Sequence, residues 1–275
     1  MQTVTKDHKP KAHPSLIVRC LRSLHLADFA FGVKKFLYQF LLVDGVRTTI
    51  AGIRYFYFVV ICRRLRTFDS KTGDLKSYAV SHNRDCMLKT VGGLSVTRSS
   101  LLLYPLSAIR ISKADPVLSI GPRTEGEILN LMGLGFHNIR ALDLITYSPW
   151  VELGDIHAMP YKDNQFAVVI IGWVLTYSKN QRKAALEAIR VVRDGGIIAV
   201  GCASATPEER ERVQGSNVPP DMRVSHWIPT FQELLDCFEP CVDHLYFAQD
   251  ILPPPATHGN LVALFSVKKS AGSAL

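Results

Sequence analysis

The strongest constraint on the fold is a regular alternation of apolar strand-like runs and amphipathic helical segments that begins at Pro116. "PVLSIG" has the composition of a short buried strand, and "TEGEILNLMGLG" continues as a helix whose apolar residues share one face. Further strand-like runs follow at 138–144, 166–174 and 196–201, and the run at 166–174 is apolar throughout, as in strands covered on both faces. Strands that alternate with helices predict an α/β fold with a doubly wound, mostly parallel Rossmann-like sheet.

Signals at the ends of the segments refine this prediction. Thr124 with Glu127, and Thr230 with Glu233, have the spacing of a capping box at a helix N-terminus. "SKNQRKAALEAIRVVRDGG" predicts a helix that closes at the glycine pair 195–196. "CVDHLYFA" and "NLVALFSVKK" are separated only by a loop, so they predict antiparallel neighbours and an antiparallel C-terminal strand. We expect this domain to occupy residues 113–270.

The chain before this domain has a different electrostatic character. Residues 1–115 contain 19 Lys and Arg against 7 Asp and Glu, whereas residues 116–275 contain 13 against 17. We expect a disordered basic tail over 1–15 and a basic, mainly helical N-terminal extension over 16–112. Within the extension, 67–99 has loop-like sequence and 101–109 predicts a short helix or strand. The charge asymmetry indicates an extension with its own partner or surface.

Two apolar runs in the extension, "FLYQFLLV" and "YFYFVVIC", leave two interpretations open. Each is about eight residues long, whereas a membrane-spanning helix needs roughly 20, and Asp44, Arg47 and Arg54 separate the two runs. One interpretation is a helix pair within residues 16–66 that lies on an anionic membrane surface, bracketed by Lys34–Lys35 and "RRLR". The other is a pair of buried helices that cover the α/β domain.

Cysteine usage indicates a reducing compartment. The chain has six cysteines without a C-x-x-C pair, and its polar, basic N-terminus does not resemble a secretory signal. We therefore expect reduced thiols in a cytoplasmic protein, with peripheral contact to the inner membrane surface as a variant. Cys237 and Cys241 lie four residues apart, but no second pair accompanies them, so no metal site is expected.

The turn after the first strand, residues 121–127, occupies the place of a nucleotide-binding loop. In doubly wound sheets ligands bind outside the carboxyl ends of the strands, near the point where the strand order reverses. Asp143 ends the second strand, 22 residues after Gly121, and an acidic residue at about that distance commonly binds ribose hydroxyls. Together these residues predict adenosine binding. The alternative is a simple tight turn at Gly121 and a helix cap at Asp143.

The charges in this turn discriminate between cofactors. A nicotinamide cofactor would place its pyrophosphate at the helix N-terminus, where Glu125 and Glu127 would repel it, and Gly126 is the only glycine left in the turn after Gly121. S-adenosyl-L-methionine (SAM) has no phosphate; it carries a sulfonium, an ammonium and one carboxylate. Glu125 would accept from the ammonium and Arg123 would pair with the carboxylate, which favours SAM. Arg123 would alternatively form an ion pair with Glu125 or Glu127.

At this point the residues resemble a known family. The run 117–201 is similar to class I SAM-dependent methyltransferases, most nearly the group called methyltransferase type 11, and the similarity extends over about residues 115–268. The stretches that carry it are "VLSIGPRTEGE", "IRALDL", "GDIHAMPYKDNQFAVVIIGWVLTYS" and "EAIRVVRDGGIIAVG". Ser119, Arg123, Glu125 and Ala167 depart from the family pattern, which keeps open a member that has lost activity.

The resemblance implies a cofactor site at successive strand ends. Its residues would be Gly121 beneath the methionine part, Asp143 with Leu144 at the ribose, Asp155, Ile156 and His157 at the adenine, and Trp173 on the sulfonium side. Trp173 would offer an aromatic face to a cation, or be a large core residue at a strand end.

The predicted function is a SAM-dependent methyltransferase that acts on a small-molecule or glycan acceptor, with O-methylation favoured. Such an enzyme mainly positions the nucleophile and the methyl group, and oxygen acceptors usually also need a general base. Candidates for the base are His226, Tyr177, His157 and His258, and spacing does not choose among them. The alternative is a non-catalytic, membrane-peripheral interaction module on the same fold. No nucleic-acid motif accompanies the basic charge, so nucleic acid is not expected as a partner.

Overall fold

The computed structural model describes residues 36–68, 80, 81, 83–85, 87, 98–215, 227–251 and 256–269. The tail expected over 1–15, most of the loop expected over 67–99 and the candidate base His226 lie outside these residues. The boundary expected at residue 113 stays a prediction.

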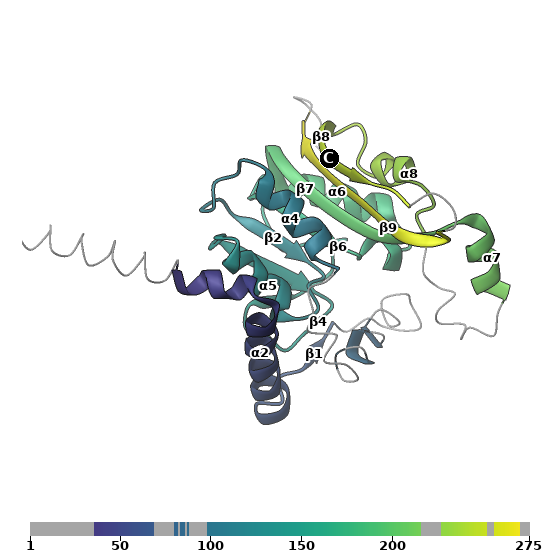
Figure 1. The fold of residues 1–275 in the computed structure, drawn as a ribbon. Helices are drawn as coiled ribbons and strands as arrows, with labels where there is room; N and C mark the ends of the chain where they lie inside the picture. Colours follow the sequence, from purple (N-terminus) through teal and green to yellow (C-terminus); the bar gives the residue numbers. More distant parts are fainter. Residues whose placement is uncertain are drawn as a thin grey trace, which may run out of the picture.

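A mixed sheet forms the centre of the protein (Figure 1). Its seven strands lie in the order β5 (Val151–Leu153), β3 (Ile139–Asp143), β2 (Val117–Ile120), β6 (Phe166–Gly172), β7 (Val192–Ala205), β9 (His258–Val267) and β8 (Val242–Gln249). β9 runs antiparallel to both β7 and β8, and the pairs from β5 to β7 are parallel. The predicted doubly wound sheet with an antiparallel C-terminal strand is confirmed. Because β3 and β6 flank β2, the strand order reverses at β2.

Helices cover both faces of the sheet. They are α4 (Ser100–Ala108), α5 (Glu125–Gly133), α6 (Gln181–Val191) and α8 (Phe231–Asp236), while α7 (Pro207–Gly215) follows β7 at the end of the sheet. One apolar cluster joins α4 and α5 to the sheet, and the other joins α6 and α8 to the opposite face. Side chains alternate along each strand, so neighbours such as Val117 and Leu118 enter different clusters.

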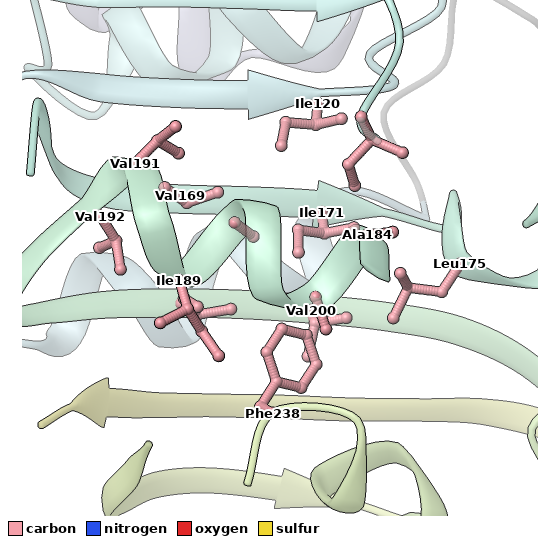
Figure 2. Packing of buried hydrophobic residues seen from close by; sticks show 14 of the residues in the cluster. Ile120, Val169, Ile171, Leu175, Ala184, Ile189, Val191, Val192, Val200 and Phe238 are labelled. Atoms are coloured by element: carbon pink, nitrogen blue, oxygen red, sulfur yellow. The ribbon is translucent and has the colours of Figure 1, made fainter. Parts of the chain in front are cut away.

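The packing beneath α6 is shown in Figure 2. Ala184 and Ile189 of the helix lie over Val169, Ile171 and Val200 of the central strands, and all five are fully buried. Such burial stabilises by about 1.5–3 kcal/mol for each large aliphatic side chain. This face therefore holds β6 and β7 rigidly, and with them the loops that leave their carboxyl ends.

Two local predictions need correction. Thr124 does precede α5, but its side chain makes no capping bond; Glu127 instead accepts from the hydroxyls of Ser119 and Ser99 at 2.5 and 2.6 Å. At Thr230 the N-cap bond does form, with Thr230 Oγ1 accepting from the Glu233 amide at 3.2 Å. At Thr124, buried tertiary partners for Glu127 outweigh the local cap.

The second correction concerns the end of α6. The helix stops at Val191 rather than at the glycine pair 195–196, and β7 begins at Val192. Val192 pairs with Phe166 of β6 in parallel register. The β-branched Val192 therefore pairs with β6 instead of extending the helix, and the pairing resumes at Ile197 opposite Val168 after a shift of register.

The helices of the extension pack on the α/β domain, as one of the two interpretations expects, and contact with a membrane stays a prediction. Its described part contains η1 (Phe40–Leu42), α2 (Asp44–Tyr55), η2 (Phe56–Ile61) and β1 (Arg66–Thr67), and β1 pairs with β4 (Ile145–Thr146). Leu41 and Ala51 are buried with Leu129 of α5, so the helices do pack on the α/β domain.

The same helices expose large apolar side chains. The exposed set consists of Phe36, Leu37, Phe40, Leu42, Val43, Ile53, Phe56, Tyr57, Val60 and Ile61, here called the apolar face of the extension. Among the described residues, no helix has the length and hydropathy required to cross a membrane.

Candidate functional site

The turn after β2 brings backbone close to the end of β6. Gly121 has φ +76°, and a Cβ at this position would lie 2.3 Å from Val174 Cγ2. A side chain is therefore excluded both by conformation and by space. Arg123 also has a positive φ of 54°, which is uncommon outside glycine and occurs where surrounding contacts hold the backbone. The turn lies close to the end of β6, and its residues Gly121 and Arg123 line the cavity described below.

Asp143 faces this turn from the end of β3. Its carboxylate accepts from the Arg123 amide at 2.8 Å and from the Ile145 amide at 3.3 Å. Burial raises the pKa of Asp143 to about 6, and the hydrogen bonds from the backbone amides only partly oppose this rise. The side chain is thus a buried, oriented acceptor that is fixed by the very turn it faces.

A hydrogen-bonded chain follows at the end of β5. His157 Nδ1 lies 2.6 Å from Asp155 Oδ1, and His157 Nε2 lies 2.6 Å from Ser178 Oγ. The Asn180 amide donates to the same Ser178 oxygen at 3.0 Å. Because Asp155 follows β5 and Ser178 follows β6, the histidine joins two loops that lie in different parts of the sequence.

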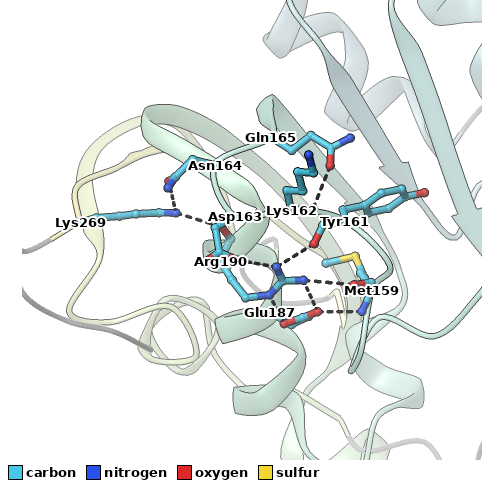
Figure 3. A network of polar contacts seen from close by, with 9 residues as sticks. All are labelled: Met159, Tyr161, Lys162, Asp163, Asn164, Gln165, Glu187, Arg190 and Lys269. Atoms are coloured by element: carbon cyan, nitrogen blue, oxygen red, sulfur yellow. Dashed lines mark hydrogen bonds and ion pairs between the residues drawn. The ribbon is translucent and has the colours of Figure 1, made fainter.

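A second network holds the loop that continues from there (Figure 3). Arg190 of α6 donates to the carbonyls of Met159 and Tyr161 at 3.1 and 2.8 Å. It also pairs with Glu187, whose carboxylate accepts from the Met159 amide at 2.7 Å. The Arg190 hydrogen bonds hold the pKa of Glu187 below its ordinary value. These bonds fix the loop after residues 155–157 against the helix.

Trp173 stands at the end of β6 with a φ of 58°. The Trp173 ring packs over Gly201, where an added Cβ would lie 3.1 Å from the ring. The indole N–H of Trp173 donates to Asn260 Oδ1 at 2.9 Å. The guanidinium of Arg98 lies 5.3 Å from the ring centroid. Trp173 is therefore a buried core residue that also lines the cavity at the strand end.

These strand ends surround one cavity of about 700 Å³, a volume that includes space open to solvent. All the cofactor-binding candidates line it except Glu125 and Gly126, and Tyr177 lines it as well. His258 begins β9 and is exposed outside the cavity lining. The structure therefore brings together residues from four separate strand ends, as the sequence predicts.

The two glutamates of the turn have other partners. Glu125 is fully buried and forms an ion pair with Arg54 of α2. Arg54 Nη2 donates to Glu125 Oε1 at 2.9 Å, and the Ser148 hydroxyl donates to the same oxygen at 2.6 Å. Burial raises the pKa of Glu127, and the two serine hydroxyls oppose this rise. Among the described residues neither carboxylate is bonded to Arg123. The ion pair within the turn, the alternative expected for Arg123, is replaced by contacts to the extension and the core. Glu125, expected to accept from the ammonium of SAM, is instead buried against Arg54 and does not line the cavity.

Sequence reasoning missed several residues of the cavity. Asn83 and Arg98 line it although they come before the α/β domain, and Ser178 reaches it through the loop after β6. No local pattern marks these residues, because their role depends on chain segments that meet only in the folded protein.

Part of the chain matches a known family. Residues 133–200 match a family model described as a methyltransferase domain. This match confirms the resemblance to class I SAM-dependent methyltransferases, and it implies SAM as the cofactor. Among curated proteins, none matches the sequence.

Solved structures with a similar fold include three that illustrate its range. A SAM-dependent methyltransferase from Thermotoga maritima is 15% identical with a TM-score of 0.45, and the match covers 70% of this chain and 97% of that one. A Haloferax volcanii protein solved with the Trm112 methyltransferase activator is 13% identical with a TM-score of 0.48, covering 72% and 100%. The [4+2]-cyclase SpnF is 12% identical with a TM-score of 0.44, covering 82% and 96%. Because these TM-scores lie below 0.5, the likenesses do not bear on function.

Proposed function

We propose that this protein transfers the methyl group of SAM to a hydroxyl of a small-molecule or glycan acceptor. The observation that carries the proposal is the pairing of Gly121 with Asp143: a turn that admits no side chain faces a buried carboxylate whose orientation is fixed by backbone amides. A ribose with two vicinal hydroxyls is the kind of group that such a carboxylate binds.

The cavity residues fit SAM in their chemical character. Asp143 would accept from the ribose hydroxyls, and Asp155 with Ile156 would lie at the adenine. Arg123, which lines the cavity at the turn, would pair with the carboxylate of the cofactor. When bound, SAM supplies a methyl group activated by its sulfonium. The protein contributes mainly position and the exclusion of water.

The acceptor hydroxyl needs a partner in the same cavity. Both ring nitrogens of His157 are already engaged, with Asp155 and Ser178, so His157 supports the cofactor loop rather than the acceptor. Tyr177 lines the cavity and is our candidate for orienting the acceptor hydroxyl. His226 remains a candidate base outside the described residues.

Calorimetry with SAM, and with its demethylated product S-adenosylhomocysteine, tests the proposal. We expect micromolar binding by the wild type and at least about tenfold weaker binding by Asp143→Asn, which keeps the shape of the side chain but loses its charge. A parallel titration with NADH should show no binding. NADH binding without SAM binding would reverse the assignment of the cofactor.

A second candidate function, a non-catalytic interaction module that docks on a membrane, is favoured by the apolar face of the extension. Exposed apolar side chains in such number on adjacent helices mark an interaction surface. The neighbouring arginines, Arg63, Arg64 and Arg66, supply the charge that attracts anionic lipids. Membrane docking is compatible with catalysis, so the two functions are tested separately.

A further inference from the structure

Two residues from the chain before the sheet reach the cavity. Arg98 precedes α4 by two residues, and α4 is anchored by Leu102, Leu103 and Leu106, which are fully buried against the sheet. Between them, Ser99 donates to the buried carboxylate of Glu127 at 2.6 Å. The backbone that carries Arg98 is therefore held from both the helix and the core, and Arg98 lines the cavity.

The N–H groups of the Arg98 guanidinium are available to bind a ligand. Its central carbon lies 5.3 Å from the centroid of the Trp173 ring, a cation–π contact that uses none of its N–H groups as a hydrogen-bond donor to another polar atom. Within the described part of the chain it has no ion pair and donates no hydrogen bond. Although Arg98 is exposed, it lines the same cavity as Asp143 and Asp155.

The other charges of the cavity are already assigned. Asp143 accepts from the amides of Arg123 and Ile145, and Asp155 is bonded to His157. SAM brings one carboxylate, for which Arg123 is the partner at the glycine turn. Arg98 is thus a second cation in a site whose cofactor needs only one.

Asn83 adds an independent observation. It lines the same cavity, and its side-chain oxygen is shielded from solvent without a hydrogen-bond partner. A shielded carbonyl oxygen without a donor costs free energy unless a ligand supplies one. The wall therefore presents a cation and an unsatisfied acceptor.

We infer that Arg98 and Asn83 form the acceptor subsite, and that the methyl acceptor carries an anionic oxygen group, a carboxylate or a phosphate, together with an O–H or N–H donor. This inference rests on the proposed function, because it assigns the part of the cavity that SAM does not need. Arg98 binds the anionic group with its planar donors, and Asn83 accepts from the neutral donor.

The first experiment separates Arg98 from the cofactor. Binding of S-adenosylhomocysteine and of 5′-methylthioadenosine, which lacks the amino-acid part, is measured for the wild type, Arg98→Gln and Arg123→Gln. We expect Arg123→Gln to lose most of the preference for S-adenosylhomocysteine and Arg98→Gln to keep it. Loss of that preference in Arg98→Gln would assign Arg98 to the cofactor and overturn the inference. Failure of the wild type to bind S-adenosylhomocysteine would instead defeat the proposed function.

The second experiment tests the acceptor. With S-adenosylhomocysteine saturating, ligand-detected NMR measures binding of 4-hydroxyphenylacetate against its amide, and of tyrosol phosphate against tyrosol. We expect at least one anion to bind about tenfold more tightly than its neutral partner, and the better anion distinguishes carboxylate from phosphate. Arg98→Gln and Asn83→Asp should abolish the preference, whereas Arg98→Lys should keep part of it. Equal binding of anions and neutral partners, binding of neither, or an unchanged preference in Arg98→Gln would overturn the inference.

Discussion

Asp143 is the residue whose protonation controls the site most directly. Burial raises its pKa to about 6 in the free protein, and under the proposed function the ionised form is the one that would accept from the ribose hydroxyls. Affinity for S-adenosylhomocysteine should therefore fall as the pH drops through 6, by about fourfold between pH 7.5 and pH 5.5. Calorimetry over this range checks the prediction, and Asp143→Asn should show a flatter profile.

The same pKa shift makes an opposite prediction for stability. Because the folded-state pKa lies above the ordinary value of 3.8, the folded protein binds more protons than the unfolded chain between these values. The free energy of unfolding, taken as wild type minus Asp143→Asn, should therefore rise as the pH falls from about 6 towards 4. A difference that stays constant with pH would show that Asp143 has an ordinary pKa.

Gly121 allows a sharper test because the chain contains a matched control. Gly195 also has a positive φ, of 67°, but a Cβ there would meet nothing within 4 Å, whereas at Gly121 it would collide with Val174. Gly195→Ala should cost about 1 kcal/mol through backbone strain alone. Gly121→Ala should cost about 2 kcal/mol more and weaken SAM binding. If urea denaturation gives the same loss in the free energy of unfolding for both variants, the close approach of Gly121 to Val174 does not contribute to stability.

At the scale of elements, the contact between α2 and α5 joins the extension to the cofactor turn. Arg54 pairs with the fully buried Glu125, and its guanidinium also lies 3.7 Å from the centroid of the Trp150 ring. Removing one partner leaves a buried charge uncompensated. We expect Arg54→Ala to lower the free energy of unfolding by about 3 kcal/mol.

An exposed pair provides the comparison. Arg140 and Glu152 pair at 2.9 Å with side chains 54% and 43% exposed, so Arg140→Ala should cost under about 1 kcal/mol. Urea denaturation of both variants, and of Arg54→Ala combined with Glu125→Gln, measures the coupling. The double variant should be more stable than Arg54→Ala, and equal losses in the two single variants would contradict a buried pair.

The same contact shows where sequence reasoning ends. The strands, the turn at Gly121 and the acidic residue at Asp143 follow from periodicity and spacing, because each depends on residues near it in the chain. Arg54 and Glu125 are 71 positions apart, and nothing in either neighbourhood marks the other as its partner. The capping box predicted at Glu127 is absent for the same reason, because a rule based on local spacing does not include Ser99 and Ser119, which the fold brings to the Glu127 carboxylate.

For the molecule as a whole, the extension both exposes the apolar face and contacts the turn after β2 through the pair of Arg54 with Glu125. Arg54 belongs to α2, between two segments that supply exposed members of the face, η1 and η2. A partner that binds the apolar face would therefore contact segments on either side of α2, the helix whose Arg54 pairs with Glu125. The arginines that follow the face, Arg63, Arg64 and Arg66, favour an anionic lipid surface.

Flotation with phosphatidylcholine vesicles, with and without about 30 mol% phosphatidylserine, tests this docking. The wild type should float with the anionic vesicles, less so at high salt because the lipid charges are then screened. Substituting Phe56, Val60 and Ile61 by Glu should lower binding more than about tenfold, because apolar burial is lost and charges of the wrong sign are added. In the matched control, Leu245 and Tyr246 of β8, which are also exposed, are replaced by Glu. This variant should float like the wild type. Equal flotation of both variants would mean that the apolar face does not contact membranes.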